Sequence, residues 1–290
     1  MIRNIVNFLK KTKKPLRTPK FYFIISIIAA FLSLRNVFLN KMKSIIVNMY
    51  TNFGATYILN IFRSLKMINK IEMFIIRHGQ TILNVQSKSQ GWSDSPLTKR
   101  GVESSHNIGK QLSRFSIESI YSSDLPRCLK TSQIVLSHIE NSQNICIHSN
   151  PCLRECNYGI FEQELESKLL KKVIEYQGIG TLKELFLKPN PVKIITDTLA
   201  VLDKTHKAEY FGEVEDRMLM GINSIIQDCT VNNQKRVLIV THSNAIIALL
   251  QKLQTSDIIN IPHDGISKIS VREDDQIVVD FVAKSINSFT

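Results

Sequence analysis

Short apolar runs alternate with longer amphipathic segments along the chain from Met73 onward. Two of the apolar runs, over 73–76 and 236–240, are each followed closely by a histidine, at residues 78 and 242. Apolar runs of this length that end in turn residues are typical of buried strands. Their alternation with amphipathic segments is typical of βα units and predicts an α/β body with a mostly parallel sheet.

Local signals predict the remaining elements. Thr98 is an expected N-cap, because threonine accepts backbone hydrogen bonds at helix starts, and the helix that follows is expected to reach about Phe115. Ile108 and Leu112 would lie on its apolar face. The other expected strands lie over 119–122, 145–148, 266–271 and 276–281, and the other expected helices start after Pro126 and over 213–228 and 244–253.

Residues 162–211 interrupt the alternation. They are rich in Glu, Lys and Leu, and glycines and prolines divide them into short pieces, at Gly178, Gly180, Pro189 and Pro191. We interpret this segment as a helical insertion that caps a site at the edge of the sheet.

The net charge of +12 is confined to the first part of the chain. Residues 1–71 hold 13 Lys+Arg and no Asp or Glu, so the rest of the chain has 37 − 13 = 24 basic and 25 acidic residues, a balance of −1. A nucleic-acid-binding domain needs its basic charge on one folded face. The composition therefore argues against nucleic acid as a partner, and it divides the chain into a basic, partly apolar leader (1–71) and a body (72–290).

Three interpretations of the leader stay open. The basic segment 1–20 precedes an uncharged apolar segment, 21–34, which is shorter than the roughly 20 apolar residues of a membrane span but suits an uncleaved signal anchor with membrane contact through residues 1–40. Basic residues without acids also suit a mitochondrial presequence. A start at Met67 or Met73 would instead make the leader an extension of the gene model. The body is accordingly expected in the cytoplasm, or in mitochondria or at a membrane if the leader is real.

Basic and acidic side chains follow several of the predicted strands. The set consists of Arg77, His78, Arg127, Glu155 and His242. Ligands of open α/β sheets bind beyond the carboxyl ends of the strands. The planar fork of arginine binds phosphate oxygens in pairs, and phosphoryl transfer depends mostly on placement and compensating charge. The pattern predicts a phosphate pocket at this edge of the sheet.

Five motifs occur in the order and spacing of the histidine phosphatase superfamily, the phosphoglycerate mutase-like enzymes. The motifs are RHGQT (77–81) with Asn84, QGWSDSPLT (90–98), SDLPRCLKT (123–131), LRECNYGIFE (153–162) and VTHSNAI (240–246). The resemblance covers about residues 72–285 and leaves the leader unmatched. It implies a phosphoglycerate mutase-like α/β fold, a three-layer sandwich with a mostly parallel central sheet and a helical insertion over the site.

The resemblance also implies residue roles. His78 matches the histidine that attacks phosphorus and carries the phosphoryl group, and Glu155 matches the proton donor to the leaving oxygen and later the base for water. The groups that would surround the phosphoryl group are Arg77, Arg127 and His242. The positions that would touch phosphate or the organic part of the substrate are Asn84, Gln90, Gly91 and Ser243.

Some positions depart from the pattern of the superfamily or fall outside its motifs. Gln163 stands where glycine is usual, so its loop is expected to bend differently, and Ser243-Asn244 replaces the usual glycine after the second histidine. His263 sits in no motif and is expected to be surface or core filler. Trp92 is expected to anchor the loop around Gln90 by packing.

Two acceptors of the phosphoryl group are possible: water, as in a phosphatase, or a second hydroxyl, as in a mutase. The loop LRECNYG lacks the distinctive sequence of true mutases, and the lysines of the insertion resemble a solvated helix face, at Lys168, Lys171 and Lys172. We therefore expect a metal-independent phosphatase, with phosphoglycerate mutase-type transfer as the alternative. An inactive docking module and a membrane-tethered protein phosphatase of the same fold are further alternatives.

The partner is expected to be a small phosphorylated substrate, without a cofactor or metal. Five cysteines without a C-x-x-C spacing argue against a disulfide framework and against a zinc site, so reduced thiols are expected. No motif indicates which phosphorylated compound is the substrate, or the oligomeric state.

Overall fold

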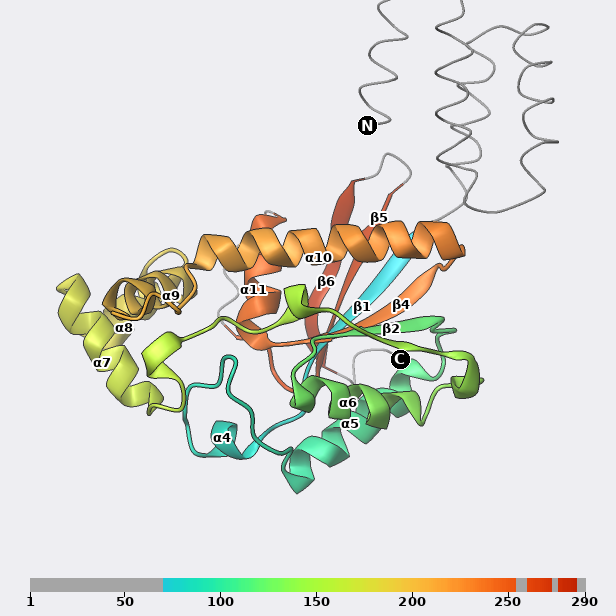
Figure 1. The fold of residues 1–290 in the computed structure, drawn as a ribbon, viewed down its shortest axis with the longest axis horizontal. Helices are drawn as coiled ribbons and strands as arrows, with labels where there is room; N and C mark the ends of the chain where they lie inside the picture. Colours follow the sequence, from blue (N-terminus) through green and yellow to red (C-terminus); the bar gives the residue numbers. More distant parts are fainter. Residues whose placement is uncertain (1–69, 254–259, 273–275, 286–290) are drawn as a thin grey trace, which may run out of the picture. The chain divides into compact units, whose positions relative to one another are not determined.

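The computed structural model describes residues 70–253, 260–272 and 276–285 (Figure 1). The predicted leader, residues 1–71, lies outside the described residues except for Lys70 and Ile71, and so do the anchor and presequence interpretations. Within the described ranges, no helix is both long enough and apolar enough to cross a membrane.

A six-stranded mixed sheet forms the centre of the fold, in the order β3-β2-β4-β1-β5-β6. The first four strands in this order are parallel, and β5 and β6 extend the sheet beyond β1 as an antiparallel pair. The strands are β1 (Ile71–Arg77), β2 (Ser119–Ser122), β3 (Ile147–Ser149), β4 (Arg236–Thr241), β5 (Gly265–Val271) and β6 (Ile277–Ser285). The predicted mostly parallel sheet is confirmed.

Helices cover both faces of the sheet, so the body has three layers (Figure 1). Alternate residues of β1 face opposite layers, because side chains alternate along a strand. Met73 and Ile75 pack with α10 (Phe211–Asn232) and α11 (Ser243–Lys252), and Phe74 and Ile76 pack with α5 (Lys99–Leu112) and α6 (Pro126–Leu136). All four of these side chains are at most 2% exposed, which explains the unbroken apolar run in the sequence.

The helices begin where local signals place them. The side chain of Thr98 accepts a hydrogen bond from the amide of Gly101 as the N-cap of α5, and Pro126 occupies the first turn of α6. Helix α10 is longer than predicted at both ends. At its start the carboxylate of Glu213 accepts from the amide of Tyr210 at 2.8 Å, and after its end Asn233 takes a left-handed conformation.

Short elements lie in the connections between the strands and the longer helices. Helix α4 (Ile82–Val85) lies between β1 and α5, and the 3₁₀ turn η1 (Ser142–Asn144) lies between α6 and β3. The 3₁₀ turns η2 (Pro151–Leu153) and η3 (Gly159–Phe161) lie between β3 and the segment interpreted as a cap. The segment interpreted as a cap contains α7 (Glu166–Gln177), α8 (Leu182–Leu187) and α9 (Pro191–Leu202). These helices share a separate core of buried residues, which are Phe161, Leu169, Val173, Leu185 and Leu199, and they group at one end of α10 (Figure 1).

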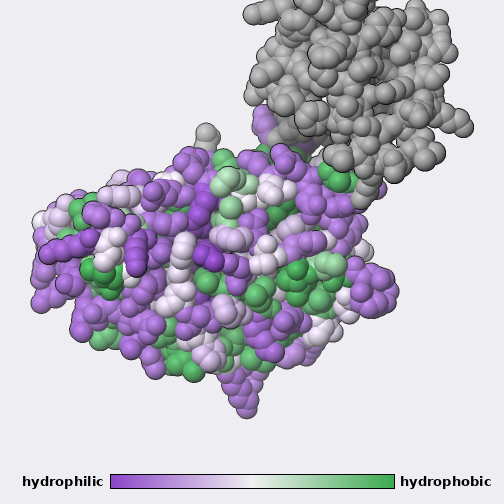
Figure 2. Space-filling model, in the orientation of Figure 1, coloured by the Kyte–Doolittle hydropathy of each residue, from purple (hydrophilic) through white to green (hydrophobic). Residues whose placement is uncertain are grey.

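The surface of the body is mixed in character. Figure 2 shows hydrophilic side chains over most of the visible face, with hydrophobic side chains in small groups between them. Lys168 and Lys171 on α7 are exposed and pair with Glu164 and Glu175 one helical turn away. The prediction that these two lysines belong to a solvated helix face is therefore confirmed.

Candidate active site

His78 follows β1 directly, and His242 follows β4 directly. Arg77 is the register partner of Thr241 in the parallel pair, and the amide of His78 donates to the carbonyl of Thr241 at 2.9 Å. The two imidazole rings therefore lie close together, with their centroids 5.1 Å apart, and both side chains are buried. The register of β1 against β4 is thus what joins two motifs that are far apart in the sequence.

The hydrogen bonding of His78 defines its reactive atom. Nδ1 lies 2.8 Å from the carbonyl oxygen of Gly79, which can only accept, so Nδ1 carries the proton and Nε2 keeps its lone pair. Burial, followed by the charges of Arg127 and Arg77, lowers the pKa of His78 well below its usual value. The ring is therefore neutral at pH 7, which is the form that can act as a nucleophile.

Arg127 fixes the second histidine. Its Nη2 lies 3.0 Å from Nδ1 of His242, and a guanidinium only donates, so this Nδ1 is the acceptor. The proton of the neutral ring is then on Nε2, which lies 2.9 Å from the hydroxyl of Ser123. Burial and the charge of Arg127 hold the pKa of His242 well below its usual value.

Arg127 is also tied to the loop before α5. Its Nη1 donates to the carbonyl of Ser93 at 2.8 Å and to a carboxylate oxygen of Asp94 at 3.0 Å. Its Nη2 donates to the carbonyl of Gly91 at 2.6 Å. The side chain is completely buried, so these contacts hold a desolvated cation in one orientation.

Two guanidinium nitrogens at the site lack acceptors. Nε of Arg77 and Nε of Arg127 are buried and have no hydrogen-bond partner among the described residues, although Nη1 of Arg77 donates to the carbonyl of Ile261 at 2.8 Å. A buried donor without an acceptor costs about 1–3 kcal/mol. Buried cationic donors of this kind suit the oxygens of a phosphoryl group.

The carboxylate of Glu155, a residue of the loop between η2 and η3, binds the first turn of α11. Its Oε1 accepts from the amides of Cys156 and Ala245 at 3.0 Å each, and its Oε2 accepts from the amide of Asn244 at 3.1 Å. Burial raises the pKa of this carboxyl, although the amide hydrogen bonds and the charges of Arg127 and Arg77 act in the opposite direction. The structure thus brings all five residues of the predicted set, Arg77, His78, Arg127, Glu155 and His242, into one electrostatically coupled cluster.

The four predicted substrate-binding residues are Asn84, Gln90, Gly91 and Ser243, and each has contacts within the protein. The side-chain oxygen of Asn84 accepts from the amide of Thr81. The side-chain oxygen of Gln90 accepts from the hydroxyl of Thr81, and its side-chain nitrogen donates to the hydroxyl of Ser95. The side chains of Asn84 and Gln90 therefore form hydrogen bonds with other residues of the protein. Ser243 accepts from the amide of Ile261, the residue whose carbonyl binds Arg77.

Gly91 allows close packing of two loops. A Cβ atom at this position would come within 2.1 Å of the carbonyl oxygen of Cys156 and 2.3 Å of Glu162. The carboxylate of Glu162 accepts from the amides of Gly91, Trp92 and Ser93 at 2.9–3.1 Å. Glu162 had no predicted role beyond its place in a motif, and it fastens the loop that holds Arg127.

His263 corrects one prediction. It was expected to be filler, but its ring lies edge-on to His78 with centroids 5.6 Å apart, and its Nδ1 lies 2.7 Å from the backbone oxygen of His78. No motif surrounds His263 in the sequence, and it reaches the site because β5 pairs with β1. Sequence patterns near His263 contain no signal for this contact.

Two other expectations concern Trp92 and Gln163. Trp92 is 40% exposed, and it anchors its loop through a hydrogen bond from Nε1 to the carbonyl of Glu155 and a contact with the guanidinium of Arg154, rather than through burial. Gln163 has φ +63°, which lies in the left-handed region that favours glycine. All five cysteines are free in the structure.

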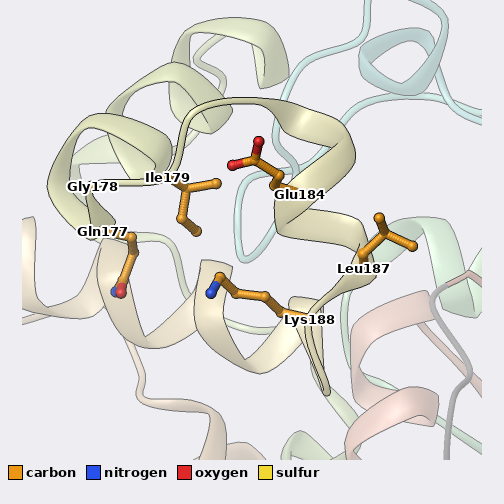
Figure 3. A pocket seen from close by; sticks show the side chains of 6 residues that line it. All are labelled: Gln177, Gly178, Ile179, Glu184, Leu187 and Lys188. Atoms are coloured by element: carbon orange, nitrogen blue, oxygen red, sulfur yellow. The ribbon is translucent and has the colours of Figure 1, made fainter.

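A separate pocket lies in the segment interpreted as a cap. Its volume is about 320 Å³, and Figure 3 shows that its lining comes from the end of α7, the turn after it and α8: Gln177, Gly178, Ile179, Glu184, Leu187 and Lys188. This lining contains neither histidine nor arginine, unlike the cluster around His78. Among the described residues, no group of three or more His, Cys, Asp or Glu side chains could hold a metal ion.

Comparisons with known proteins agree with the class that the site indicates. The family model of the histidine phosphatase superfamily (branch 1) matches residues 73–179. The chain is 29% identical over 180 residues to a probable phosphoglycerate mutase GpmB of Proteus mirabilis (strain HI4320). The matched region covers 62% of this chain and 73% of that protein.

Solved structures agree with the fold. The crystal structure of phosphoglycerate mutase from Bacillus anthracis str. Sterne matches with a TM-score of 0.70 and 28% identity, covering 77% of this chain and 96% of that one. The alpha-ribazole phosphatase from Shigella flexneri has the same fold at 20% identity, with a TM-score of 0.56 and coverage of 74% and 96%.

The chain therefore belongs to the histidine phosphatase superfamily and has its phosphoglycerate mutase-like α/β fold. It is an enzyme of this superfamily, whose matched members carry the names of phosphoglycerate mutases and of phosphatases.

Proposed function

We propose that this enzyme hydrolyses phosphomonoesters through a phosphohistidine on His78. The observation that carries the proposal is the convergence of a neutral histidine with a free Nε2, a second buried histidine and two arginines whose Nε atoms lack acceptors. A nucleophile beside preoriented cationic donors is the arrangement that phosphoryl transfer needs.

The reaction divides into two steps. Nε2 of His78 forms a bond to phosphorus, the ester P–O bond breaks, and the leaving oxygen takes a proton from Glu155. Water then attacks the phosphohistidine and gives its proton to Glu155, the P–N bond breaks, and inorganic phosphate leaves. The raised pKa of Glu155 supports its service as an acid in the first step, and Arg77 and Arg127 offset the charge on the equatorial oxygens in both steps.

The first test is chemical trapping of the intermediate. The full chain is mixed with a ³²P-labelled aryl phosphate and quenched in alkali, which preserves phosphohistidine. We expect acid-labile label on a peptide that contains His78, and none after His78→Ala. Label on another residue, or turnover without any labelled enzyme, would disprove the covalent mechanism.

Phosphoglycerate mutase-type transfer is the second candidate. It is supported by the printed names of the relatives from Proteus mirabilis and Bacillus anthracis. A mutase returns the phosphoryl group from histidine to another hydroxyl and must exclude water while it does so. The exposed, paired lysines of α7 favour the phosphatase, because they are not gathered to hold a second anionic group.

One incubation separates the two candidates. The enzyme is given 3-phosphoglycerate and, separately, an aryl phosphate, and both free phosphate and 2-phosphoglycerate are measured. A phosphatase releases phosphate from at least one of them without isomerisation. Formation of 2-phosphoglycerate without phosphate release would instead establish the mutase.

A further inference from the structure

The backbone around the nucleophile is hydrogen-bonded at four consecutive groups. The amide of His78 donates to Thr241, the amide of Gly79 donates to the hydroxyl of Thr131 at 3.0 Å, and the carbonyl of Gly79 accepts from the ring of His78. The remaining group is the carbonyl of His78, and its partner is Nδ1 of His263 at 2.7 Å.

The loop that carries His263 is itself fastened to the site. Ile261, two residues earlier, accepts from Arg77 through its carbonyl and donates to Ser243 through its amide. His263 thus reaches His78 from a segment that two other residues of the site hold in place. Its ring meets the ring of His78 edge-on, at an interplanar angle of 64°.

The contact fixes the tautomer of His263. A carbonyl oxygen only accepts, so Nδ1 of His263 is the donor and carries the proton. Burial and the nearby charge of Arg77 lower the pKa of His263 to about 4, so the ring stays neutral around pH 7. The hydrogen bond from His263 to the carbonyl of His78 therefore joins two neutral groups. His263 adds no positive charge to that of the arginines.

We propose that His263 is a positioning residue for the nucleophile: its Nδ1–H holds the carbonyl of His78 and thereby sets the direction of the attacking Nε2. The physical reason lies in the peptide that joins His78 to Gly79. The carbonyl that His263 binds and the Gly79 carbonyl that orients the His78 ring are neighbours along the chain, so rotation of this peptide would turn the ring away from its line of attack. Small errors in the placement of reacting atoms cost large factors in rate.

This inference rests on the proposed function, since it assigns a residue to the same reaction. The test uses complementary substitutions of His263 in the full chain. His263→Asn keeps a donor, because the side-chain amide nitrogen of asparagine lies at about the place of Nδ1, but it removes the ring. His263→Phe keeps the ring and its edge contact but removes the donor, and His263→Ala removes both.

A matched control is available at His206. This histidine is exposed and has φ +55°, a conformation that asparagine adopts readily, so His206→Asn makes the same chemical change away from the site. The measurements are kcat and KM on an aryl phosphate, the single-turnover rate of His78 phosphorylation, and thermal unfolding to verify that each variant is folded.

We expect His263→Phe and His263→Ala to lower the phosphorylation rate and kcat by about 10- to 100-fold at nearly constant KM, and His263→Asn to stay within about threefold of the unmodified enzyme. If His263→Phe does not fold, His263→Ala supplies the same comparison. Equal loss in folded His263→Asn and His263→Ala would overturn the proposal, because the donor would then not be the essential part. Full activity without the donor, or a change confined to KM, would overturn it as well.

Nitrogen-15 NMR of the His78 ring separates this inference from the proposed function. The Nδ1–H form of His78 should give one sharp tautomeric signature in the unmodified chain and in His263→Asn, and a broadened or mixed signature in His263→Ala. If no phosphohistidine forms at all, the proposed function fails. An unchanged ring signature in His263→Ala would show instead that positioning by His263 is wrong.

Discussion

At the scale of single residues, Arg127 does more than supply charge. The four N–H groups on Nη1 and Nη2 serve three acceptors on the loop 91–94 and the ring of His242, and Nε, which has no acceptor among the described residues, would bind the substrate in the proposed mechanism. The planar guanidinium is what allows one side chain to meet acceptors in several directions within one plane. A lysine at this position would keep the charge and lose that geometry.

Arg127→Lys is therefore expected to reduce kcat/KM by about 10²- to 10³-fold, the cost typical of losing a preoriented donor at a reacting group. Steady-state kinetics on an aryl phosphate measure the loss. Arg272→Lys, at an exposed position, is the control and should leave the kinetics unchanged. A loss at Arg127 no larger than at Arg272 would remove Arg127 from the proposed mechanism.

Glu155 gives a second prediction at this scale, because an acid matters most when the leaving group is poor. Glu155→Gln should lower kcat/KM for an alkyl phosphate by about 10²-fold or more and should affect a nitrophenyl phosphate far less. The measurement is the ratio of the two losses. Equal losses on both substrates would mean that Glu155 is not the proton donor.

At the scale of elements, the geometry of the site depends on hydrogen bonds between the loop at Glu162 and the loop that begins at Gly91. Glu162, which follows η3, binds three successive amides of the loop that begins at Gly91, and that loop provides the acceptors of Arg127. The packing is too close at Gly91 for any Cβ atom. The orientation of Arg127 is thus decided partly by a carboxylate outside the predicted catalytic set.

Glu162→Ala should consequently lower both stability and activity. Four amides, those of Gly91, Trp92, Ser93 and Tyr158, would lose their acceptor, which we expect to reduce the free energy of unfolding by about 1–3 kcal/mol. A loosened Arg127 should lower kcat by about tenfold. Urea denaturation and steady-state kinetics measure the two effects.

Glu164→Ala is the matched control two residues away. The side chain of Glu164 is 38% exposed and its ion pair with Lys168 lies in solvent, so Glu164→Ala should leave the free energy of unfolding nearly unchanged. Equal effects of the two substitutions would contradict the assigned role of Glu162.

At the scale of the whole molecule, three buried histidines connect folding to pH. His78, His242 and His263 all have pKa values below the usual 6.5 in the folded protein, mainly because burial disfavours their charged forms. Between its folded pKa and 6.5, each ring binds a proton in the unfolded chain but not in the folded one. The unfolded state is then favoured, so this group of histidines makes stability fall as pH decreases below 6.5.

His263 makes this prediction measurable, because its folded pKa is about 4 and its neighbours Arg77 and Arg100 are cations that oppose its protonation. As the pH falls from 6.5 to 4, the free energy of unfolding should decrease less steeply in His263→Asn than in the unmodified chain. The two slopes should differ by at most about 1.4 kcal/mol per pH unit. Urea denaturation at several pH values gives the two slopes. Equal slopes in His263→Asn and the unmodified chain would refute the prediction.

The sequence by itself determined the elements and the residues that could do the chemistry. Strands and helices follow from local patterns, such as the apolar run at 73–76 and the cap at Thr98, because burial and backbone capping act within a few residues of chain. Arg77, His78 and His242 could be named for a similar reason, since a parallel sheet brings the ends of its strands to one edge.

Only the tertiary structure decided how these residues are held. The contact of His263 with His78 depends on the pairing of β5 with β1, and the contact of Glu162 with the loop at Gly91 depends on two loops packing without a side chain between them. Neither contact leaves a periodic or compositional pattern, because the partners are distant in sequence and each contributes a single residue. Atomic packing between distant segments therefore oriented the site that local patterns had predicted.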